Sequence, residues 1–222
     1  MLLLAVDTSG KHGSIALARC GPDDACNIID VIPLAGGTFS AQLVPQIAEL
    51  LRRYGFARHD LGGFAAASGP GSFTGLRVGL AAIKALAEAM EKPIAAISLL
   101  EALAVADARQ GKVYAALDAG RGEIYVGEYD HGKTTVFGEK LLTREEFFKL
   151  CRGKFVVTPD LPIAEAVQQA GADAKVVERP RSDAVARLGW KRLQAGQTIA
   201  PEDLEANYIR RSDAEIFSKA GS

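Results

Sequence analysis

Residues 62–79, GGFAAASGPGSFTGLRVG, decide the fold of this chain. The small apolar run 62–67 predicts a closely packed strand, and the glycine-rich loop 68–73 separates it from a long helix expected over 74–90. A further strand is expected over 94–97. A strand, a helix and another strand in this order predict a parallel crossover unit.

The same order of elements occurs twice along the chain. In the first half, three strands and one helix precede the crossover unit, with expected ranges of 2–6, 13–19, 27–34 and 40–54, and Ser40 is expected to cap the helix. A helix expected over 98–108 ends the first half. The second half begins with a strand at 113 and repeats the pattern, with further strands starting at 123, 134, 155 and 175 and helices starting at 143, 162 and 182. In the helix that begins at Thr143, Glu146 completes a capping box.

Two such halves predict a duplicated α/β fold of the actin-like, sugar-kinase-like (ASKHA) type, with two similar subdomains and mixed sheets. The expected division places residues 1–108 in an N-terminal subdomain and residues 109–222 in a C-terminal subdomain. The last helix is a candidate for packing back on the first subdomain. Fold alone assigns no function.

Composition sets limits on the class of protein. The chain has 222 residues, 48% of them hydrophobic, and a formal net charge of −1, so it lacks a strongly basic nucleic-acid footprint. Three cysteines, Cys20, Cys26 and Cys151, without metal-type spacing indicate free thiols in a reducing compartment. Cys20 and Cys26 flank a predicted hairpin turn, so the two can lie close together. The N-terminus lacks a signal-peptide pattern and no run reaches a membrane span, so we expect a cytoplasmic protein.

Two segments suggest ligand chemistry, and each has a structural alternative. The glycines of the loop let a backbone approach a phosphate closely, but their G-x-G-x-x-x-G spacing misses the dinucleotide fingerprint, and a tight strand-to-helix turn explains them equally well. The second segment, 7–9, is expected either to contact a nucleotide or to close a hairpin as an Asx-turn. The residues expected to contact a nucleotide, should one bind, are Asp7, Thr8, Ser9, Gly69, Gly71 and Ser72. The three histidines of the chain are far apart in the sequence, so no histidine metal site is expected.

The helices at 40–54 and 74–90 have apolar stripes wider than one core-facing side needs. Deep burial explains this, and so does a helical surface for another subunit. On the second reading, the predicted partner-interface residues are Leu43, Ile47, Leu50, Leu76, Gly79, Leu80 and Ile83.

The chain resembles the TsaB (YeaZ) family in several segments that follow one another in order. They are 4–9 (LAVDTS), 67–79 (ASGPGSFTGLRVG), 97–104 (ISLLEALA), 117–125 (LDAGRGEIY) and 208–211 (YIRR). The second is specific by itself, and the others are specific together. One departure is Phe39-Ser40, where many relatives have His-Ser before the helix.

The resemblance implies a part in making threonylcarbamoyladenosine, a modified nucleoside beside the anticodon of tRNA. It implies a noncatalytic partner and activator of a TsaD-type catalytic subunit, which acts together with a TsaE-type ATPase. Such a protein is expected to form a homodimer when alone and to contact tRNA only within the complex. No association with a membrane is expected. TsaD-type proteins have a His-x-x-x-His metal pair where this chain has Leu99 and Leu103, whose aliphatic side chains have no lone pair for a metal. No metal and no cofactor are therefore expected to be required. The alternative is an autonomous ATP-binding or ATP-hydrolysing enzyme that uses Asp7 and the glycine loop.

Overall fold

The computed structural model describes residues 1–23, 25–107, 109, 111–130 and 135–209. The chain forms two compact units, the first made of Met1–Leu99 and Pro180–Asn207 and the second of Leu100–Arg179 with Tyr208 and Ile209. The sequence-based division falls after residue 108, which lies outside the described residues, as do Arg210 and Arg211. Residues 180–207 join the first unit because their helix packs on its sheet.

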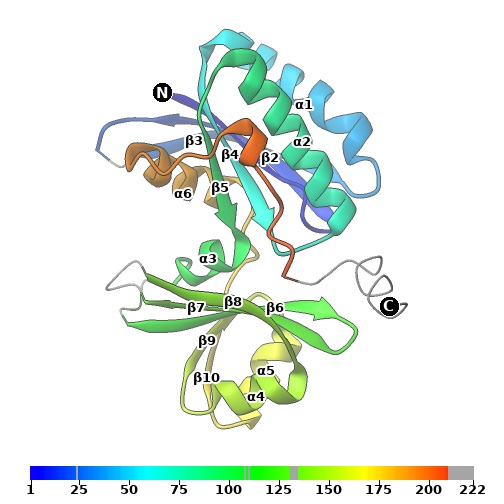
Figure 1. Cartoon of the computed structure of the whole chain (residues 1–222), viewed down its shortest axis with the longest axis vertical. Coiled ribbons are helices and arrows are strands. Elements are labelled where there is room, and N and C mark those ends of the chain that lie inside the picture. Colours follow the sequence, from blue (N-terminus) through cyan, green and yellow to red (C-terminus); the bar gives the residue numbers. More distant parts are fainter. Residues whose placement is uncertain (24, 108, 110, 131–134, 210–222) are drawn as a thin grey trace. The chain divides into compact units, whose positions relative to one another are not determined.

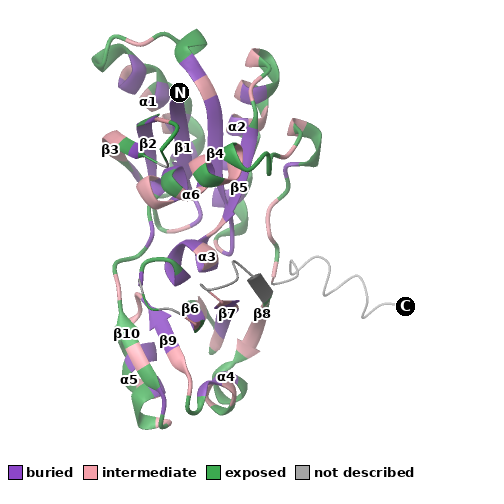
Figure 2. Cartoon of the chain, turned by 90° about the vertical axis from the view of Figure 1, so that its left-hand side faces the viewer, coloured by how far each residue is buried: buried purple, intermediate pink, exposed green. Residues whose placement is uncertain are grey.

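The first unit is built on a five-stranded mixed sheet in the order β3-β2-β1-β4-β5. Its strands are β1 (Leu2–Asp7), β2 (His12–Cys20), β3 (Cys26–Ala35), β4 (Leu61–Gly69) and β5 (Ile94–Ser98). The first three form an antiparallel meander, whereas β4 pairs parallel to both β1 and β5. Figure 2 shows that β1 is buried along its length, as expected of a central strand covered on both faces.

Helices cover both faces of this sheet (Figure 1). They are α1 (Phe39–Arg53) and α2 (Phe73–Met90) on one face and α6 (Ser182–Gln194) on the other, with the short turns η1 (Arg58–Asp60) and η2 (Pro201–Asp203) at the edges. Leu4, Val6 and Phe64 share one core cluster with the inward side chains of α1 and α2. On the other face, Gly189 of α6 lies against Ala65, where a larger residue would not fit.

The second unit repeats this topology in a sheet of order β10-β9-β6-β7-β8. Its strands are β6 (Lys112–Gly120), β7 (Glu123–Asp130), β8 (Thr135–Thr143), β9 (Phe155–Thr158) and β10 (Asp173–Val176). Its helices are α3 (Leu99–Ala104), α4 (Arg144–Cys151) and α5 (Leu161–Gln169). Phe147, Val156 and Ile163 lie in its core cluster.

The predicted fold class is confirmed, because two five-stranded mixed sheets of matching order are present. The predicted capping box is also present, with Thr143 accepting from the Glu146 N–H and Glu146 accepting from the Thr143 N–H. Two details differ from prediction. The helix expected over 98–108 ends at Ala104, and Ser40 does not cap α1, which begins at Phe39 after Thr38.

Candidate functional site

The turn between β1 and β2 is fastened to the start of α2. The Thr8 hydroxyl donates a hydrogen bond to the Gly75 carbonyl oxygen at 2.7 Å, and the Ser72 N–H donates to the Ser9 carbonyl oxygen at 2.6 Å. Within the turn, the Asp7 carboxylate accepts from the Ser9 N–H at 2.9 Å, which is an Asx-turn. The first two contacts join the N-terminal hairpin to the glycine-rich loop and α2, and the third closes the turn itself.

The contact between the β1–β2 turn and the start of α2, which we call the joint, depends on three glycines of the loop and α2. Their lack of a side chain lets the backbones of the two segments approach closely. A Cβ added at Gly71 would meet the Ser9 carbonyl oxygen, one at Gly75 the Thr8 carbonyl oxygen, and one at Gly79 the Thr8 hydroxyl, all well inside contact distance. The G-x-x-x-G spacing of the last two puts them on one face of α2, where the turn lies. Close packing of turn on helix therefore accounts for these glycines.

A cavity of about 680 Å³ opens beside the joint. Its walls come from the β1–β2 turn, the segment between β3 and α1, and the first turns of α2. The lining residues are Ser9, Gly10, Lys11, His12, Ala35, Gly36, Gly37, Phe39, Ser40, Ser72, Thr74, Gly75 and Val78. None of them is acidic, and the first turns of α1 and α2 contain no acidic residue either. The chemistry of this lining suits an anionic or hydroxyl-bearing group.

The predicted nucleotide contacts divide into two groups in the structure. Ser9 and Ser72 line the cavity, whereas Asp7, Thr8, Gly69 and Gly71 do not. Phe39 supplies an apolar wall of the cavity. The sequence reading missed Lys11, His12, Ser40 and Thr74, which come from segments far apart along the chain.

The structure corrects the choice of helix face. Leu43, Ile47, Leu50, Leu76, Gly79, Leu80 and Ile83 are all buried within the first unit. These residues form the stripe that packs toward the sheet, so their side chains are not available to a partner. The apolar part of the outer face of α1 and α2, which we call the outer helical face, consists of Ala41, Val44, Pro45, Ala48, Phe73, Ala81, Ala85 and Ala89, with the charged Arg52, Arg77 and Glu88 also exposed on these helices.

The outer helical face is mostly small and apolar. Val44 is 55% exposed and Phe73 is 38% exposed, with the Arg77 guanidinium 3.7 Å from the centre of the Phe73 ring. Ala81, Ala85 and Ala89 follow one another at i, i+4 spacing and are exposed, which leaves the backbone of α2 open to close approach by another helix.

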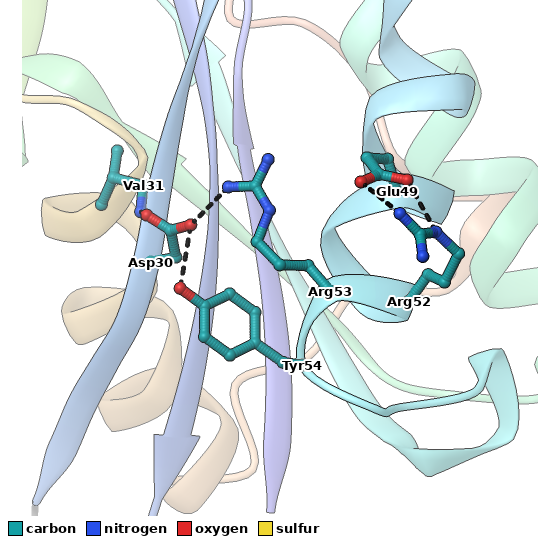
Figure 3. Close-up of polar contacts among 6 residues, drawn as sticks. All are labelled: Asp30, Val31, Glu49, Arg52, Arg53 and Tyr54. Atoms are coloured by element: carbon teal, nitrogen blue, oxygen red, sulfur yellow. Dashed lines mark hydrogen bonds and ion pairs between the residues drawn. The ribbon is translucent and has the colours of Figure 1, made fainter.

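Polar contacts fix the C-terminal end of α1 to β3. Figure 3 shows the Asp30 carboxylate accepting hydrogen bonds from Arg53 at 3.2 Å and from the Tyr54 hydroxyl at 3.1 Å. Partial burial and the bond to Asp30 raise the pKa of the Tyr54 hydroxyl. A second pair in Figure 3, Glu49 and Arg52, lies wholly within α1. Of the two sets of contacts in Figure 3, those of Asp30 join α1 to the sheet and add to the packing of its buried side chains.

The residues at the expected metal-pair positions lie in α3. Leu99 and Leu103 are both buried, at 4% and 0% exposure. Among the described residues, no group of three or more histidine, cysteine or acidic side chains is arranged to hold a metal ion. Nor does any helix in the described ranges have the length and apolar character needed to cross a membrane.

Comparison with known proteins places this chain in a family. The profile of the family described as "TsaD: tRNA N6-adenosine threonylcarbamoyltransferase" matches residues 31–184. The chain is 38% identical to the tRNA threonylcarbamoyladenosine biosynthesis protein TsaB of Bacillus subtilis, over 59% of this chain and 56% of that protein. It is 27% identical to the TsaB of Escherichia coli, over 96% of each.

The solved structure of YeaZ from Pseudomonas aeruginosa has the same fold. It superposes with a TM-score of 0.73 over 93% of this chain and 99% of that one, at 24% identity. The matches in sequence and in fold agree with the motifs quoted above. The chain belongs to the TsaB (YeaZ) family, within the wider group that the TsaD profile describes.

Proposed function

We propose that this chain is a noncatalytic partner subunit in tRNA threonylcarbamoyladenosine biosynthesis, where it activates a TsaD-type catalytic subunit. The observation that supports it most is family membership combined with the side chains of α3. Leu99 and Leu103 stand where TsaD-type proteins have metal-binding histidines, and both are packed into the protein interior. Aliphatic side chains at these positions have no donor atom for a metal.

The outer helical face is the proposed partner surface. Two long helices lie side by side on the first sheet, and their exposed stripe is apolar and contains many alanines. Helices with small residues at the contact pack at short interaxial distances, so a partner's helices can complete a bundle here. The same surface would serve a TsaD-type subunit and, in its absence, a second copy of this chain. A TsaE-type ATPase and tRNA would join through the assembled complex.

Reconstitution tests the proposed activity. Purified TsaD-type and TsaE-type proteins are incubated with unmodified tRNA, ATP and the threonylcarbamoyl donor, with and without this chain, and the modified nucleoside is quantified by mass spectrometry. We expect modification only when this chain is present, and none from this chain alone. Equal yields with and without it would refute the proposal.

Single aspartates on the outer helical face test the surface. Val44→Asp and Ala81→Asp each introduce a charge that a bundle would bury without a partner, at a cost of several kcal/mol in association. Both positions are exposed, so the variants should remain folded. The matched control is Val176→Asp on β10, where the valine is 47% exposed.

Light scattering, alone and with the TsaD-type subunit, measures the outcome beside a circular dichroism melt. The two helix variants should lose association while the β10 variant retains it. If Val44→Asp and Ala81→Asp stay folded and still associate, the partner surface lies elsewhere.

A second candidate, an autonomous ATP-binding or ATP-hydrolysing enzyme, is favoured by the cavity beside the β1–β2 turn. Its basic and hydroxyl side chains suit phosphate. Magnesium-dependent phosphate release by the pure protein, lost on Lys11→Ala, would establish it. We expect no such turnover, because the Asp7 carboxylate is engaged in the Asx-turn and the neighbouring Thr8 hydroxyl is bonded to α2.

A further inference from the structure

The first unit contains two cysteines that face each other across a strand pair. Cys20 ends β2 and Cys26 begins β3, and the two are opposite in the antiparallel register. Their Sγ atoms are 2.7 Å apart, and both thiols are free. Conversion to a disulfide bond would require the sulfurs to approach by about 0.7 Å, since an S–S bond is ~2.05 Å long.

The backbone geometry at this pair suits a covalent bridge. The N–H and carbonyl of Cys20 are both used on the β1 side, where they bond to the Met1 carbonyl oxygen at 2.9 Å and the Met1 amino group at 2.6 Å. On the other side, the next bond toward β3 runs from the Gly21 N–H to the Ala25 carbonyl oxygen. Cys20 and Cys26 therefore form a non-hydrogen-bonded pair, the closer type, with Cα atoms roughly 4.5 Å apart, within the span of a disulfide.

The two thiols have different chemical roles. A hydrogen bond from Cys20 lowers the pKa of the Cys26 thiol, and the nearby Arg187 guanidinium adds to this effect. The Arg187 side chain is held beside the pair by a 3.0 Å hydrogen bond to the Cys26 carbonyl oxygen. The bond to Cys26 and burial raise the pKa of Cys20. Cys26 is the more exposed of the two thiols, and its carbonyl oxygen holds the Arg187 guanidinium beside the pair. We therefore assign Cys26 as the nucleophile and Cys20 as the resolving thiol.

We propose that Cys20 and Cys26 are a redox modification site, which hydrogen peroxide converts to a cross-strand disulfide and which thiol reductants restore. The Cys26 thiolate attacks one peroxide oxygen, the O–O bond breaks, and the leaving hydroxide takes a proton to become water. Cys20 then attacks the Cys26 sulfur, the S–O bond breaks, and a second water leaves with the Cys20 proton. Two thiols and one peroxide give one disulfide and two waters, with both sulfurs oxidised and the peroxide reduced.

Burial favours peroxide over a larger oxidant. Cys20 and Cys26 are only 2% and 7% exposed, which admits a molecule of peroxide size more readily than a bulky disulfide. In a reducing compartment the pair would rest as thiols and oxidise only transiently. Neither property depends on the proposed tRNA-modification role.

Cys151 is the internal control within the same chain. It is fully buried on α4, its thiol donates to the Phe148 carbonyl oxygen at 3.5 Å, and burial raises its pKa. With its sulfur held as an inert thiol, it should not compete for oxidant.

The test uses the reduced full-length chain, exposed to a small excess of peroxide, alkylated, and digested with trypsin. Cys20 and Cys26 fall in one tryptic peptide, residues 20–52, so a bridge lowers its mass by two hydrogens and blocks alkylation at both sites. We expect two of the three thiols to be lost, Cys151 to remain alkylated, and dithiothreitol to restore all three. Oxidation of Cys151 first, or separate sulfinic acids on Cys20 and Cys26 without a bridge, would overturn the proposal.

Three cysteine variants test the roles assigned to the individual thiols. Cys20→Ser should trap a sulfenic acid on Cys26 that reacts with dimedone, whereas Cys26→Ser should give no dimedone adduct on Cys20. Cys151→Ser should form the disulfide as the parent does. Dimedone labelling of Cys20 in place of Cys26 would refute the assigned nucleophile, and a circular dichroism melt verifies that each variant is folded.

Discussion

The first and second units share one topology but differ in how the first turn is packed and in the length of their crossover helices. Each opens with an antiparallel meander, adds two parallel strands beyond the first strand, and has a helix in each crossover. Even the first turn is repeated, since Asp7 accepts from the Ser9 N–H and Asp118 accepts from the Gly120 N–H. The duplication is therefore visible at the level of single hydrogen bonds.

The surroundings of that turn differ between the units. In the first unit, Thr8 and Ser9 pack against Gly71 and Gly75. In the second, an added Cβ at Gly120 or Gly122 would meet nothing within 4 Å. The same turn is thus closely packed against a helix in the first unit. In the second it has space around its glycines and is joined to its neighbours by hydrogen bonds, from the Asp118 N–H to the Asp160 carboxylate and from the Arg144 N–H to the Gly122 carbonyl oxygen.

The crossover helices differ in length as well. α1 and α2 have 15 and 18 residues, whereas α4 and α5 have 8 and 9. The first parallel strand differs in the same direction, since β4 has 9 residues and β9 has 4. The longer helices of the first unit also expose more surface, and the outer helical face runs along both of them.

The strongest test of the comparison is alanine at a glycine of each turn region. Gly75→Ala drives a methyl group into the Thr8 backbone, so we expect a loss of about 3 kcal/mol or more in unfolding free energy. Gly122→Ala, at a φ of +78° in open space, should lose only about 1 kcal/mol. Urea denaturation followed by circular dichroism measures both, and equal losses would remove the distinction between the two turns.

Thr8→Val tests the hydrogen bond of the joint while keeping its shape. Loss of the buried bond to the Gly75 carbonyl oxygen should lower the unfolding free energy by about 1 to 2 kcal/mol. Ala119→Val is the matched change in the turn of the second unit and should be close to neutral. A neutral Thr8→Val would show that packing alone maintains the joint.

Asp107→Asn tests the charged contacts on which the second unit relies. The hydrogen bond from Lys175, at 2.9 Å, and the bond from the Arg109 N–H hold the pKa of Asp107 below its usual range. A lowered folded-state pKa stabilises the fold above the ordinary value near 3.9, and the stabilisation is lost as the pH falls through the folded value. We expect a melting temperature about 2 to 4 °C lower at neutral pH. The difference from the parent should shrink below about pH 4, and a deficit that does not change with pH would contradict this account.

The smallest effect is expected for the two carboxylates of Figure 3. Asp30→Asn weakens the contacts that join α1 to β3 and should lower the melting temperature slightly, more so in low salt. Glu49→Gln removes an exposed pair within α1 and should leave the melting temperature unchanged within error. The reverse order would mean that the end of α1 is not held by Asp30.

Periodic segments could be predicted well from the sequence. The expected helix over 74–90 and the capping box at Thr143 agree closely with α2 and α4, because hydrophobic spacing and local capping chemistry act within a few residues. The exception is α3, which stops at Ala104. Three residues later Asp107 bonds to Lys175, a contact between distant segments that local propensity does not report.

The face of a helix that meets the sheet could not be predicted in the same way. α2 has leucine, isoleucine and alanine around most of its circumference, so its sequence contains two usable stripes. Shape decides between them, because Gly75 and Gly79 must face the β1–β2 turn and this rotates Leu76, Leu80 and Ile83 inward. The cavity could not be predicted from the sequence either, because Lys11 and Ser40 come to line the same cavity only after β2 and β3 pair.

The return of residues 180–207 to the first unit has a consequence for biosynthesis. The face of the first sheet that α6 covers includes Ala65 and Ala95. This face stays uncovered during synthesis until α6 has left the ribosome, which happens only after the whole of Leu100–Arg179 has been made. The strands and helices of the second unit, which all lie within Leu99–Arg179, can therefore form before the first sheet is covered, although they are synthesised later. A nascent chain that stalls short of α6 presents an uncovered apolar sheet, which is the kind of surface that chaperones bind.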